Sequence, residues 1–161
     1  MYLFGFGSLI NLKSAQKSFD RVLKQSDLIP VSIKGYEKVW NSIENIKFED
    51  EKQVNGIFLN RKKEPNSSTN GVIIKITDEE FEVLKLREKN YSYIQIEATD
   101  VIGVNLEENI IAFMTTNEEK IAKNGEENSF IASKYIEILT DALKNYDEAF
   151  VIEYKKILHD F

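Results

Sequence analysis

A glycine-rich turn near the start of the chain is one of two segments whose residue types could do chemistry. It follows an apolar strand, and glycines let a backbone approach a ligand closely while successive amide groups point into one concavity. Such amides can hold a carboxylate or stabilise an oxyanion. The alternative is a tight turn that needs glycine only for its backbone conformation. The segment consists of Phe4, Gly5, Phe6, Gly7, Ser8, Leu9 and Ile10.

This turn does not match the glycine motifs that bind phosphate groups. A dinucleotide-binding loop would need Gly or Ala at the position of Ile10. A P-loop would need Gly-Lys-Ser or Gly-Lys-Thr after the glycines, and no such sequence follows. The segment therefore predicts no nucleotide cofactor.

A single carboxylate, Glu88, is the second candidate. On a helical wheel it shares a sector of about 60° with Phe81 and Leu84. A carboxylate on an apolar face is desolvated, which raises its pKa and makes it a better proton carrier near neutral pH. The alternative is a solvated glutamate at a helix end, paired with Arg87 or Lys85.

The residue types that the chain lacks narrow the chemistry further. It has no cysteine, which excludes thiol nucleophiles, disulfides and thiolate metal sites. Its one histidine, His159, is close to the last residue, so a catalytic triad or a multi-histidine metal site would depend on it alone. We therefore expect no metal site, and we expect acid-base work to fall to a carboxylate, a tyrosine or a lysine.

Length and composition are those of an ordinary globular protein. The 161 residues, 42% hydrophobic and 30% charged, predict one domain spanning 1–161. No apolar run approaches the roughly 20 residues that span a bilayer, and the start lacks a secretory signal, so we expect a cytoplasmic protein without a membrane partner. The net charge of −6 disfavours a nucleic-acid partner. The sequence does not predict an oligomeric state.

The elements around the turn form the first part of the expected fold. Residues 1–10 predict a buried strand that runs into the turn, and 14–24 a short helix with Ser14 as N-cap. Residues 28–60 alternate as β-strands do, and the polar stretch 61–71 predicts a surface loop. Bends or turns are expected at Pro30, Gly35 and Asn55-Gly56, and inward side chains at Val31, Ile33, Val39, Ile43, Ile57 and Leu59.

The helix that carries Glu88 has its own start signal. Residues 71–76 predict a strand, after which Thr77 and Glu80 have the spacing of a capping box. A short helix should follow to about Lys89, where Asn90 can end it.

The rest of the chain predicts further strands and then two helices. Strands are expected at 91–98, 101–104 and 110–115, followed by a polar loop over 116–128. Apolar residues after position 130 then recur at steps of three and four, which predicts two amphipathic helices. The fold class is therefore α+β, with a mixed, mostly antiparallel sheet. Periodicity leaves open whether that sheet closes into a small barrel.

The two candidate segments together resemble the γ-glutamylcyclotransferase superfamily. Its members carry a Tyr-Gly-Ser-Leu-like turn after the first strand, seen here as Phe6-Gly7-Ser8-Leu9. Downstream they have a Gly-Val strand, a short helix and an Arg-Glu-x-x-Tyr segment, and the likeness extends over most of the chain. The matching residues downstream are Leu59-Asn60, Gly71-Val72, Arg87-Glu88-Lys89-Asn90-Tyr91 and Ala112-Phe113-Met114-Thr115-Thr116.

The resemblance implies roles for particular residues. Glu88 would be the catalytic acid/base, and the turn from Gly5 to Leu9 would bind a γ-glutamyl group through its backbone amides. Phe4 and Tyr91 belong to the same implied substrate-binding set. Two departures remove hydroxyl groups, because Phe6 replaces the usual tyrosine of the turn and Phe113 stands where many members have tyrosine.

The resemblance also implies a reaction that needs no cofactor. The α-amine of a γ-glutamyl group attacks its own γ-carbonyl and releases 5-oxoproline. The turn looks closest to the glutathione-acting, ChaC-type branch, although Asn11 stands where that branch often has Trp. γ-Glutamyl amino acids and γ-glutamyl-amines are the other candidate substrates. A non-catalytic binding module or interaction protein that keeps the same pocket is the alternative function.

Overall fold

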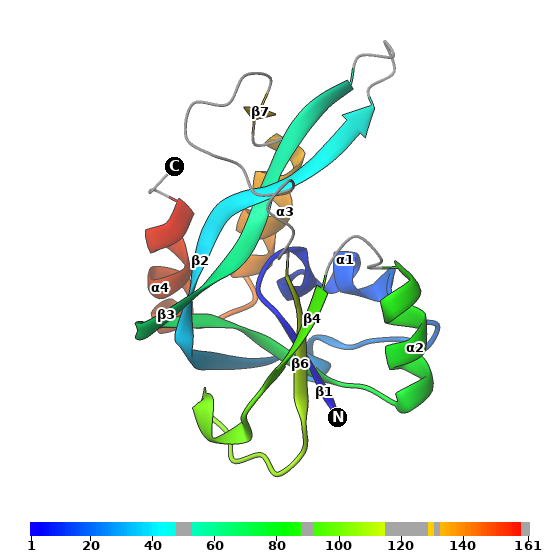
Figure 1. The fold of residues 1–161 in the computed structure, drawn as a ribbon, viewed down its shortest axis with the longest axis vertical. Helices are drawn as coiled ribbons and strands as arrows, with labels where there is room; N and C mark the ends of the chain where they lie inside the picture. Colours follow the sequence, from blue (N-terminus) through cyan, green and yellow to red (C-terminus); the bar gives the residue numbers. More distant parts are fainter. Residues whose placement is uncertain (48–52, 88–91, 115–128, 131–132, 159–161) are drawn as a thin grey trace.

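A mixed β-sheet with helices at its sides forms the centre of the molecule in the computed structural model (Figure 1). The structure describes residues 1–161 except 48–52, 88–91, 115–128, 131–132 and 159–161. The strands are β1 (Tyr2–Gly5), β2 (Ile29–Lys47), β3 (Gln53–Lys75), β4 (Ser92–Ile96), β5 (Val101–Ile102), β6 (Ile110–Met114) and β7 (Ser129–Phe130). The helices are η1 (Ser8–Ile10), α1 (Leu12–Gln16), η2 (Gln25–Asp27), α2 (Asp78–Arg87), η3 (Ala98–Asp100), α3 (Ser133–Leu143) and α4 (Glu148–Leu158).

The first strand lies inside the sheet rather than at its edge. The strand order is β4-β6-β1-β3-β2-β5, and β7 pairs with β3 outside this path. β1 runs parallel to β6 and antiparallel to β3, so the sheet is mixed as predicted. In the part of the chain that the structure describes, β4 and β5 do not pair with each other, and the curled sheet stays an open half-barrel (Figure 1). The predicted α+β class is therefore confirmed, without closure into a barrel.

A long hairpin of β2 and β3 replaces a predicted turn and a predicted surface loop. Asn55 and Gly56 lie within β3, opposite Asn45 and Glu44, so the turn predicted there is wrong. The surface loop predicted for 61–71 is also wrong, because these residues belong to β3, and 61–63 and 68–71 pair with β2 on either side of an irregularity. Polar composition is typical of loops, but cross-strand pairing decided the conformation here.

Buried polar side chains explain how this polar stretch fits into a strand. Thr69 is buried and its hydroxyl donates to the backbone oxygen of Tyr36 at 2.9 Å. Asn70 is buried and its amide donates to the backbone oxygen of Phe150 at 3.0 Å. Each group thus recovers a hydrogen bond lost on leaving water. Of the predicted inward residues, Val31 and Ile33 are buried, and the side chains of Val39, Ile43, Ile57 and Leu59 lie outside the described part.

The helix after the glycine-rich turn is shorter than predicted and begins earlier. Its N-cap is Asn11, whose side-chain oxygen accepts from the backbone N–H of Ser14 at 3.2 Å, so the prediction of Ser14 as cap is wrong. α1 ends at Gln16, and the Gln16 side chain forms hydrogen bonds with the non-helical residues that follow. It donates to the backbone oxygen of Arg21 at 2.8 Å and accepts from the N–H of Leu23 at 2.7 Å.

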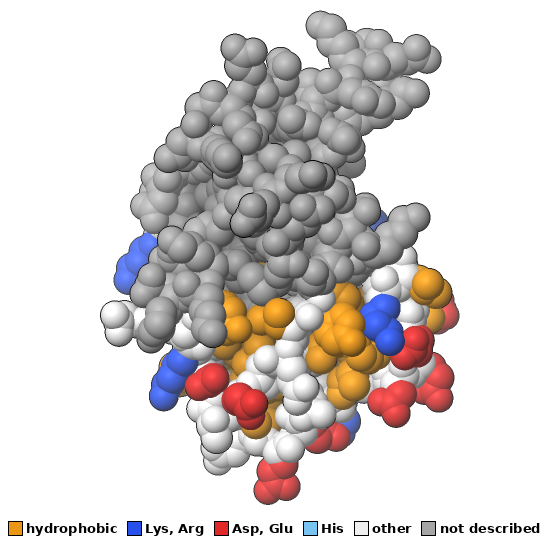
Figure 2. All heavy atoms as spheres, viewed as in Figure 1, with side chains coloured by type: hydrophobic (Ala, Val, Ile, Leu, Met, Phe, Trp, Pro, Cys, Tyr) orange, Lys and Arg blue, Asp and Glu red, His pale blue; other side chains and the backbone are white. Residues whose placement is uncertain are grey.

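Helix α2 begins where its capping box predicts. The Thr77 hydroxyl accepts from the N–H of Glu80 at 3.1 Å, and the Glu80 carboxylate accepts from the N–H of Thr77 at 3.0 Å. The described helix ends at Arg87, and the predicted end at Lys89-Asn90 lies outside the described residues. Figure 2 shows acidic side chains gathered over this helix, at the right of the view.

The two predicted C-terminal helices are present as α3 and α4. Leu139, Ala142 and Leu143 of α3 and Phe150 and Tyr154 of α4 join the single buried core cluster. The predicted strands at 91–98, 101–104 and 110–115 appear in shorter form as β4, β5 and β6, whereas β7 was not predicted and the loop predicted for 116–128 lies outside the described residues. No described helix is both long enough and apolar enough to cross a membrane.

Candidate functional site

Close packing, rather than a left-handed backbone, explains Gly5 before the turn and Gly71 beside it. A Cβ atom on Gly5 would lie 2.5 Å from the Cβ atom of Leu9, and one on Gly71 would lie 2.3 Å from the backbone oxygen of Gly5. Gly7 has φ −107°, and Gly5 is not among the described glycines with positive φ. The turn folds directly back onto β1 and β3 because these positions carry no side chain.

Every backbone carbonyl from Phe6 to Ser8 accepts a hydrogen bond. The Tyr154 hydroxyl donates to the Phe6 oxygen at 2.5 Å. The N–H of Ile10 donates to the Gly7 oxygen at 3.1 Å, and the N–H of Asn11 donates to the Ser8 oxygen at 3.0 Å. These bonds fix the peptide planes of the turn, since a peptide group is rigid and planar.

The amide groups of the same turn are free within the described structure. In this part of the molecule, the backbone N–H groups of Gly7, Ser8 and Leu9 donate no hydrogen bond to another described residue. These three residues are half-buried, so they are reachable from outside the core. Adjacent N–H groups with fixed directions can donate hydrogen bonds to a carboxylate or an oxyanion.

The aromatic residues of the turn segment belong to the core instead. Phe4 and Phe6 are buried, and their rings stack with centroids 6.1 Å apart. A ligand at the turn would therefore meet the backbone of Gly7 to Leu9 rather than these rings.

Helix α2 buries the face on which the sequence places Glu88. Leu84 is buried and Phe81 half-buried, whereas the second apolar face of the helix, Val83 and Leu86, is 48% and 77% exposed. The Phe81–Leu84 face is thus the one that packs against the protein, and Glu88 follows Leu84 by one helical step of four residues in the sequence. Glu88 itself lies outside the described residues, as does Tyr91.

The basic neighbours that could pair with a solvated Glu88 have other partners. The Lys85 ammonium lies 2.8 Å from a Glu82 carboxylate oxygen and 4.7 Å from the centre of the Phe81 ring. The Arg87 guanidinium donates to the backbone oxygen of Lys17. Both cations on the exposed side of α2 are therefore already engaged.

Comparisons with solved structures identify the fold. The chain superposes with a TM-score of 0.68 and 13% identity on a protein described as gamma-glutamyl cyclotransferase, covering 96% of this chain and 85% of that one. It matches an uncharacterized Homo sapiens protein, loc79017, with a TM-score of 0.66 and 13% identity over 96% of this chain and 84% of that one. The chain has the γ-glutamylcyclotransferase fold.

The same fold is found in part of a larger bacterial protein. YkqA from Bacillus subtilis matches with a TM-score of 0.64 and 18% identity, over 97% of this chain and 53% of YkqA. No protein-family model matches the chain, and no curated protein matches its sequence. Identities this low establish the shared γ-glutamylcyclotransferase fold alone.

An aromatic cluster links α2 to the sheet of this γ-glutamylcyclotransferase fold. Tyr93 of β4 meets the Phe81 ring edge-on at 5.2 Å and the Phe113 ring at 6.3 Å. Phe113 is half-buried in this cluster. It is the residue noted above for standing where many members of the γ-glutamylcyclotransferase superfamily have tyrosine. The sequence did not single out Tyr93, because no pattern distinguishes it from the other tyrosines.

Burial and hydrogen-bonding partners together determine the pKa values of Glu80 and Tyr146. Burial alone would raise the pKa of Glu80, but the hydrogen bond and ion pair with Arg21 at 2.9 Å and the bonds with Thr77 outweigh it, and the net pKa is lowered. Burial raises the pKa of Tyr146 to about 12, partly offset by a hydrogen bond with Gln25. Tyr146 thus stays protonated and donates to the backbone oxygen of Ile10 at 2.5 Å.

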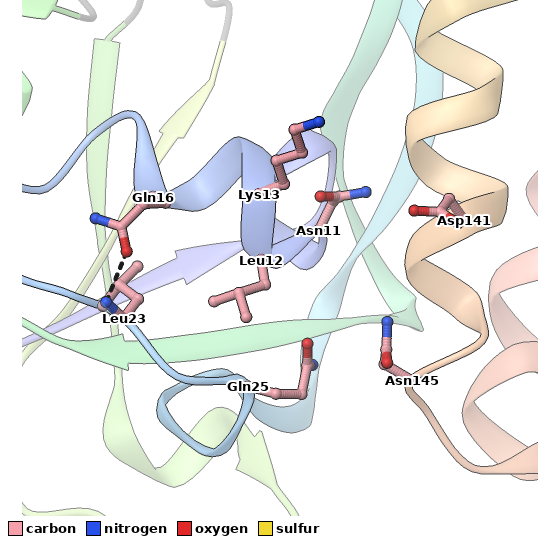
Figure 3. Close-up of a pocket in the computed structure, with 8 residues that line it drawn as sticks. All are labelled: Asn11, Leu12, Lys13, Gln16, Leu23, Gln25, Asp141 and Asn145. Atoms are coloured by element: carbon pink, nitrogen blue, oxygen red, sulfur yellow. Dashed lines mark hydrogen bonds between the residues drawn. The ribbon is translucent and has the colours of Figure 1, made fainter.

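A groove of about 500 Å³ between α1 and α3 was not predicted (Figure 3). In Figure 3 the Asn11 side chain points toward α3, where its amide donates to the backbone oxygen of Ile138 at 3.0 Å. The groove contains none of the predicted site residues, and its lining amides Asn11 and Gln16 already bond within the protein. Among the described residues, no acidic or histidine cluster could hold a metal ion.

Proposed function

We propose that this protein is a γ-glutamylcyclotransferase that releases 5-oxoproline from a γ-glutamyl substrate. The observation that carries the proposal is the row of free N–H groups at Gly7, Ser8 and Leu9, held in fixed directions at the end of β1. The shared fold supports it, and so does the buried Phe81–Leu84 face of the helix that precedes Glu88.

The proposed reaction is an intramolecular aminolysis. Nucleophile and electrophile belong to one molecule, so much of the entropic cost is met by the conformation in which the substrate binds. The Glu88 carboxylate takes a proton from the α-ammonium, and the free amine attacks the γ-carbonyl carbon. The carbon–nitrogen bond to the leaving group then breaks as Glu88 returns the proton to that nitrogen. The ring nitrogen gives up its second proton through the same carboxylate to the departing amine, which leaves 5-oxoproline and an ammonium product. This proton transfer contributes on the order of 10²- to 10⁴-fold in rate.

The N-terminal turn supplies binding rather than proton transfer in this proposal. The amides from Gly7 to Leu9 hold the α-carboxylate of the γ-glutamyl group, and Tyr91 adds a contact from the segment after α2. Glutathione, γ-glutamyl amino acids and γ-glutamyl-amines are the substrates to compare, in a cytoplasmic setting without a cofactor.

Detection of 5-oxoproline by mass spectrometry tests the proposal. The purified protein is incubated with glutathione and a panel of γ-glutamyl dipeptides and amines, beside the Glu88→Gln variant. We expect release by the wild-type protein and a loss of at least about 100-fold in Glu88→Gln, because the amide keeps the shape of the side chain but cannot carry the proton. Circular dichroism should show the same fold for both.

A matched variant in α2 distinguishes loss of the proposed acid/base from loss of one negative charge. Glu82 is exposed and pairs with Lys85, so Glu82→Gln removes one acidic charge and should keep the wild-type rate. Wild-type release of 5-oxoproline by Glu88→Gln would refute the assignment of the acid/base. Saturable binding of γ-glutamyl compounds with no release would support the non-catalytic alternative.

A further inference from the structure

We propose that Tyr154 is the positioning residue of the γ-glutamyl-binding turn, because its buried hydroxyl sets the direction of the Gly7 N–H group. The inference rests on the proposed function and adds to it a residue from the C-terminal helix. Tyr154 is fully buried in α4 and donates to the backbone oxygen of Phe6 at 2.5 Å.

The geometry of the peptide group relates the Tyr154 hydroxyl to the direction of the Gly7 N–H group. The Phe6 carbonyl and the Gly7 N–H belong to the same planar peptide group, and the described chain has no cis peptide bond. In a trans peptide these two groups point in opposite directions. A hydroxyl that holds the Phe6 oxygen toward the core therefore holds the Gly7 N–H away from it.

The directions of the other two free amides, on Ser8 and Leu9, are fixed by hydrogen bonds within the turn. The Ser8 N–H shares a peptide group with the Gly7 carbonyl, which Ile10 holds, and the Leu9 N–H shares one with the Ser8 carbonyl, which Asn11 holds. The first amide depends instead on a residue 148 positions away in the sequence. Tyr154 thus completes a row of donors that local structure would leave incomplete.

Packing of helix α4 fixes the position of the Tyr154 hydroxyl. The Tyr154 ring stacks on Phe150 with centroids 6.0 Å apart, and Phe150 stacks on Tyr146 at 4.4 Å. The Asn70 side chain of β3 donates to the backbone oxygen of Phe150 at 3.0 Å, which ties α4 to the sheet. The hydroxyl of Tyr154 cannot follow a displaced Phe6 carbonyl without moving these partners.

The Tyr154→Phe variant removes only the hydroxyl and keeps the stacked ring. With the Phe6 carbonyl released, the Gly7 N–H loses its fixed direction and the substrate loses part of a charge-assisted hydrogen bond. We expect KM for the γ-glutamyl substrate to rise about tenfold, with kcat changed less than about threefold, since this contact is made before the reaction as well as during it.

Tyr146→Phe is the matched control because Tyr146 makes an equally short bond to the same segment. Its hydroxyl donates to the Ile10 oxygen at 2.5 Å, and the N–H of that peptide group, on Asn11, is already bound to the Ser8 oxygen. Both variants should lose stability, but the increase in KM should be several-fold smaller for Tyr146→Phe. Equal increases in the two variants would overturn the proposal.

A second readout responds to positioning and not to general loss of structure. A γ-glutamyl compound is compared with its α-carboxamide analogue, which lacks the negative charge that the amides hold. The wild-type protein should prefer the carboxylate, and Tyr154→Phe should lose most of this preference whereas Tyr146→Phe keeps it. A preference unchanged in Tyr154→Phe would also overturn the proposal.

An NMR titration separates failure of this inference from failure of the proposed function. The ¹⁵N-labelled protein is titrated with a γ-glutamyl dipeptide, and the amide signals of Gly7, Ser8 and Leu9 are followed. If the wild-type protein binds without turnover and Tyr154→Phe binds about tenfold more weakly, the catalytic function fails and the positioning role stands. If those amide signals do not shift in the wild-type protein, the positioning role is overturned.

Discussion

The N-terminal turn and helix α2, the two halves of the candidate site, are held in place by different means. The turn is fixed by carbonyl hydrogen bonds, one of them from Tyr154 in the last described helix. Helix α2 begins at its own capping box and docks through Leu84, its one buried side chain among the described residues 78–87, and it also contacts Lys17, Arg21 and Tyr93.

The proposed function assigns binding to the turn and proton transfer to the segment after α2. One backbone donor of the turn, the Gly7 N–H, has a direction that depends on a distant residue, so the turn should be sensitive to a change far away in the sequence. Helix α2 directly precedes Glu88 in the sequence, and its start is set by Thr77 and Glu80, so it should respond most to changes within its own few turns. The following variants test this contrast.

Leu84→Ala should have the largest effect on α2. Leu84 is 2% exposed, and a buried Leu→Ala change costs about 3 kcal/mol, which corresponds to a fall of roughly 6–12 °C in Tm for a chain of this size. Leu86→Ala on the exposed face should change stability by less than about 0.5 kcal/mol. Urea denaturation of both variants measures the difference, and similar losses would show that α2 does not dock through Leu84.

Asn11→Ala should have the next largest effect and acts on the turn side. It removes the cap on the Ser14 N–H and the bond to the Ile138 oxygen, so we expect a loss of about 2 kcal/mol. Ser14→Ala, at the position predicted as cap from sequence, should cost less than about 0.5 kcal/mol. Thermal unfolding compares the two, and a larger loss in Ser14→Ala would contradict the capping assignment.

Thr77→Ala should cost about 1 kcal/mol, because it removes the hydroxyl that accepts from the Glu80 N–H at the start of α2. Hydrogen exchange should increase for the first turn of α2 and stay unchanged at Ile10 and Asn11, whose N–H groups are bonded within the N-terminal turn. Thr140→Ala is the control, because Thr140 is exposed in α3 and alanine favours a helix interior. Faster exchange in the N-terminal turn as well would show that the N-terminal turn and α2 are not held independently.

Glu80→Gln should have the smallest effect and should depend on pH. The folded-state pKa of Glu80 lies below its ordinary value of 4.5, so the carboxylate stabilises the protein above that value and loses this contribution as pH falls through the lowered pKa. Because Arg21 is substantially exposed, we expect about 0.5 kcal/mol near pH 7. The difference between wild type and variant should shrink below about pH 4, and a difference constant with pH would exclude the ionised pair as its source.

The sequence predicted α2 well because its signals are local. Thr77 and Glu80 mark the start, and the spacing of Phe81 and Leu84 marks the face that the structure buries. The α+β class and the two C-terminal helices were predictable for the same reason, since periodicity is read over a few turns. The role of Glu88 stays a prediction, because it lies outside the described residues.

Features that depend on distant partners were not predictable. A pattern of neighbouring residues contains no sign that the Tyr154 hydroxyl meets the Phe6 carbonyl, or that the Asn11 side chain reaches α3. The polar stretch before Gly71 has the composition of a loop, and its pairing with β2 outweighed that preference. In each case a tertiary contact decided between conformations that the local sequence allowed.

The bond between Tyr154 and Phe6 also orders events during synthesis. The turn leaves the ribosome early, whereas its partner hydroxyl is translated 148 residues later. A nascent chain that has formed its first strand therefore lacks this bond, and the Gly7 amide acquires its final direction only when the last described helix docks. If the positioning role of Tyr154 stands, the turn becomes competent to bind a ligand only in a late step of folding.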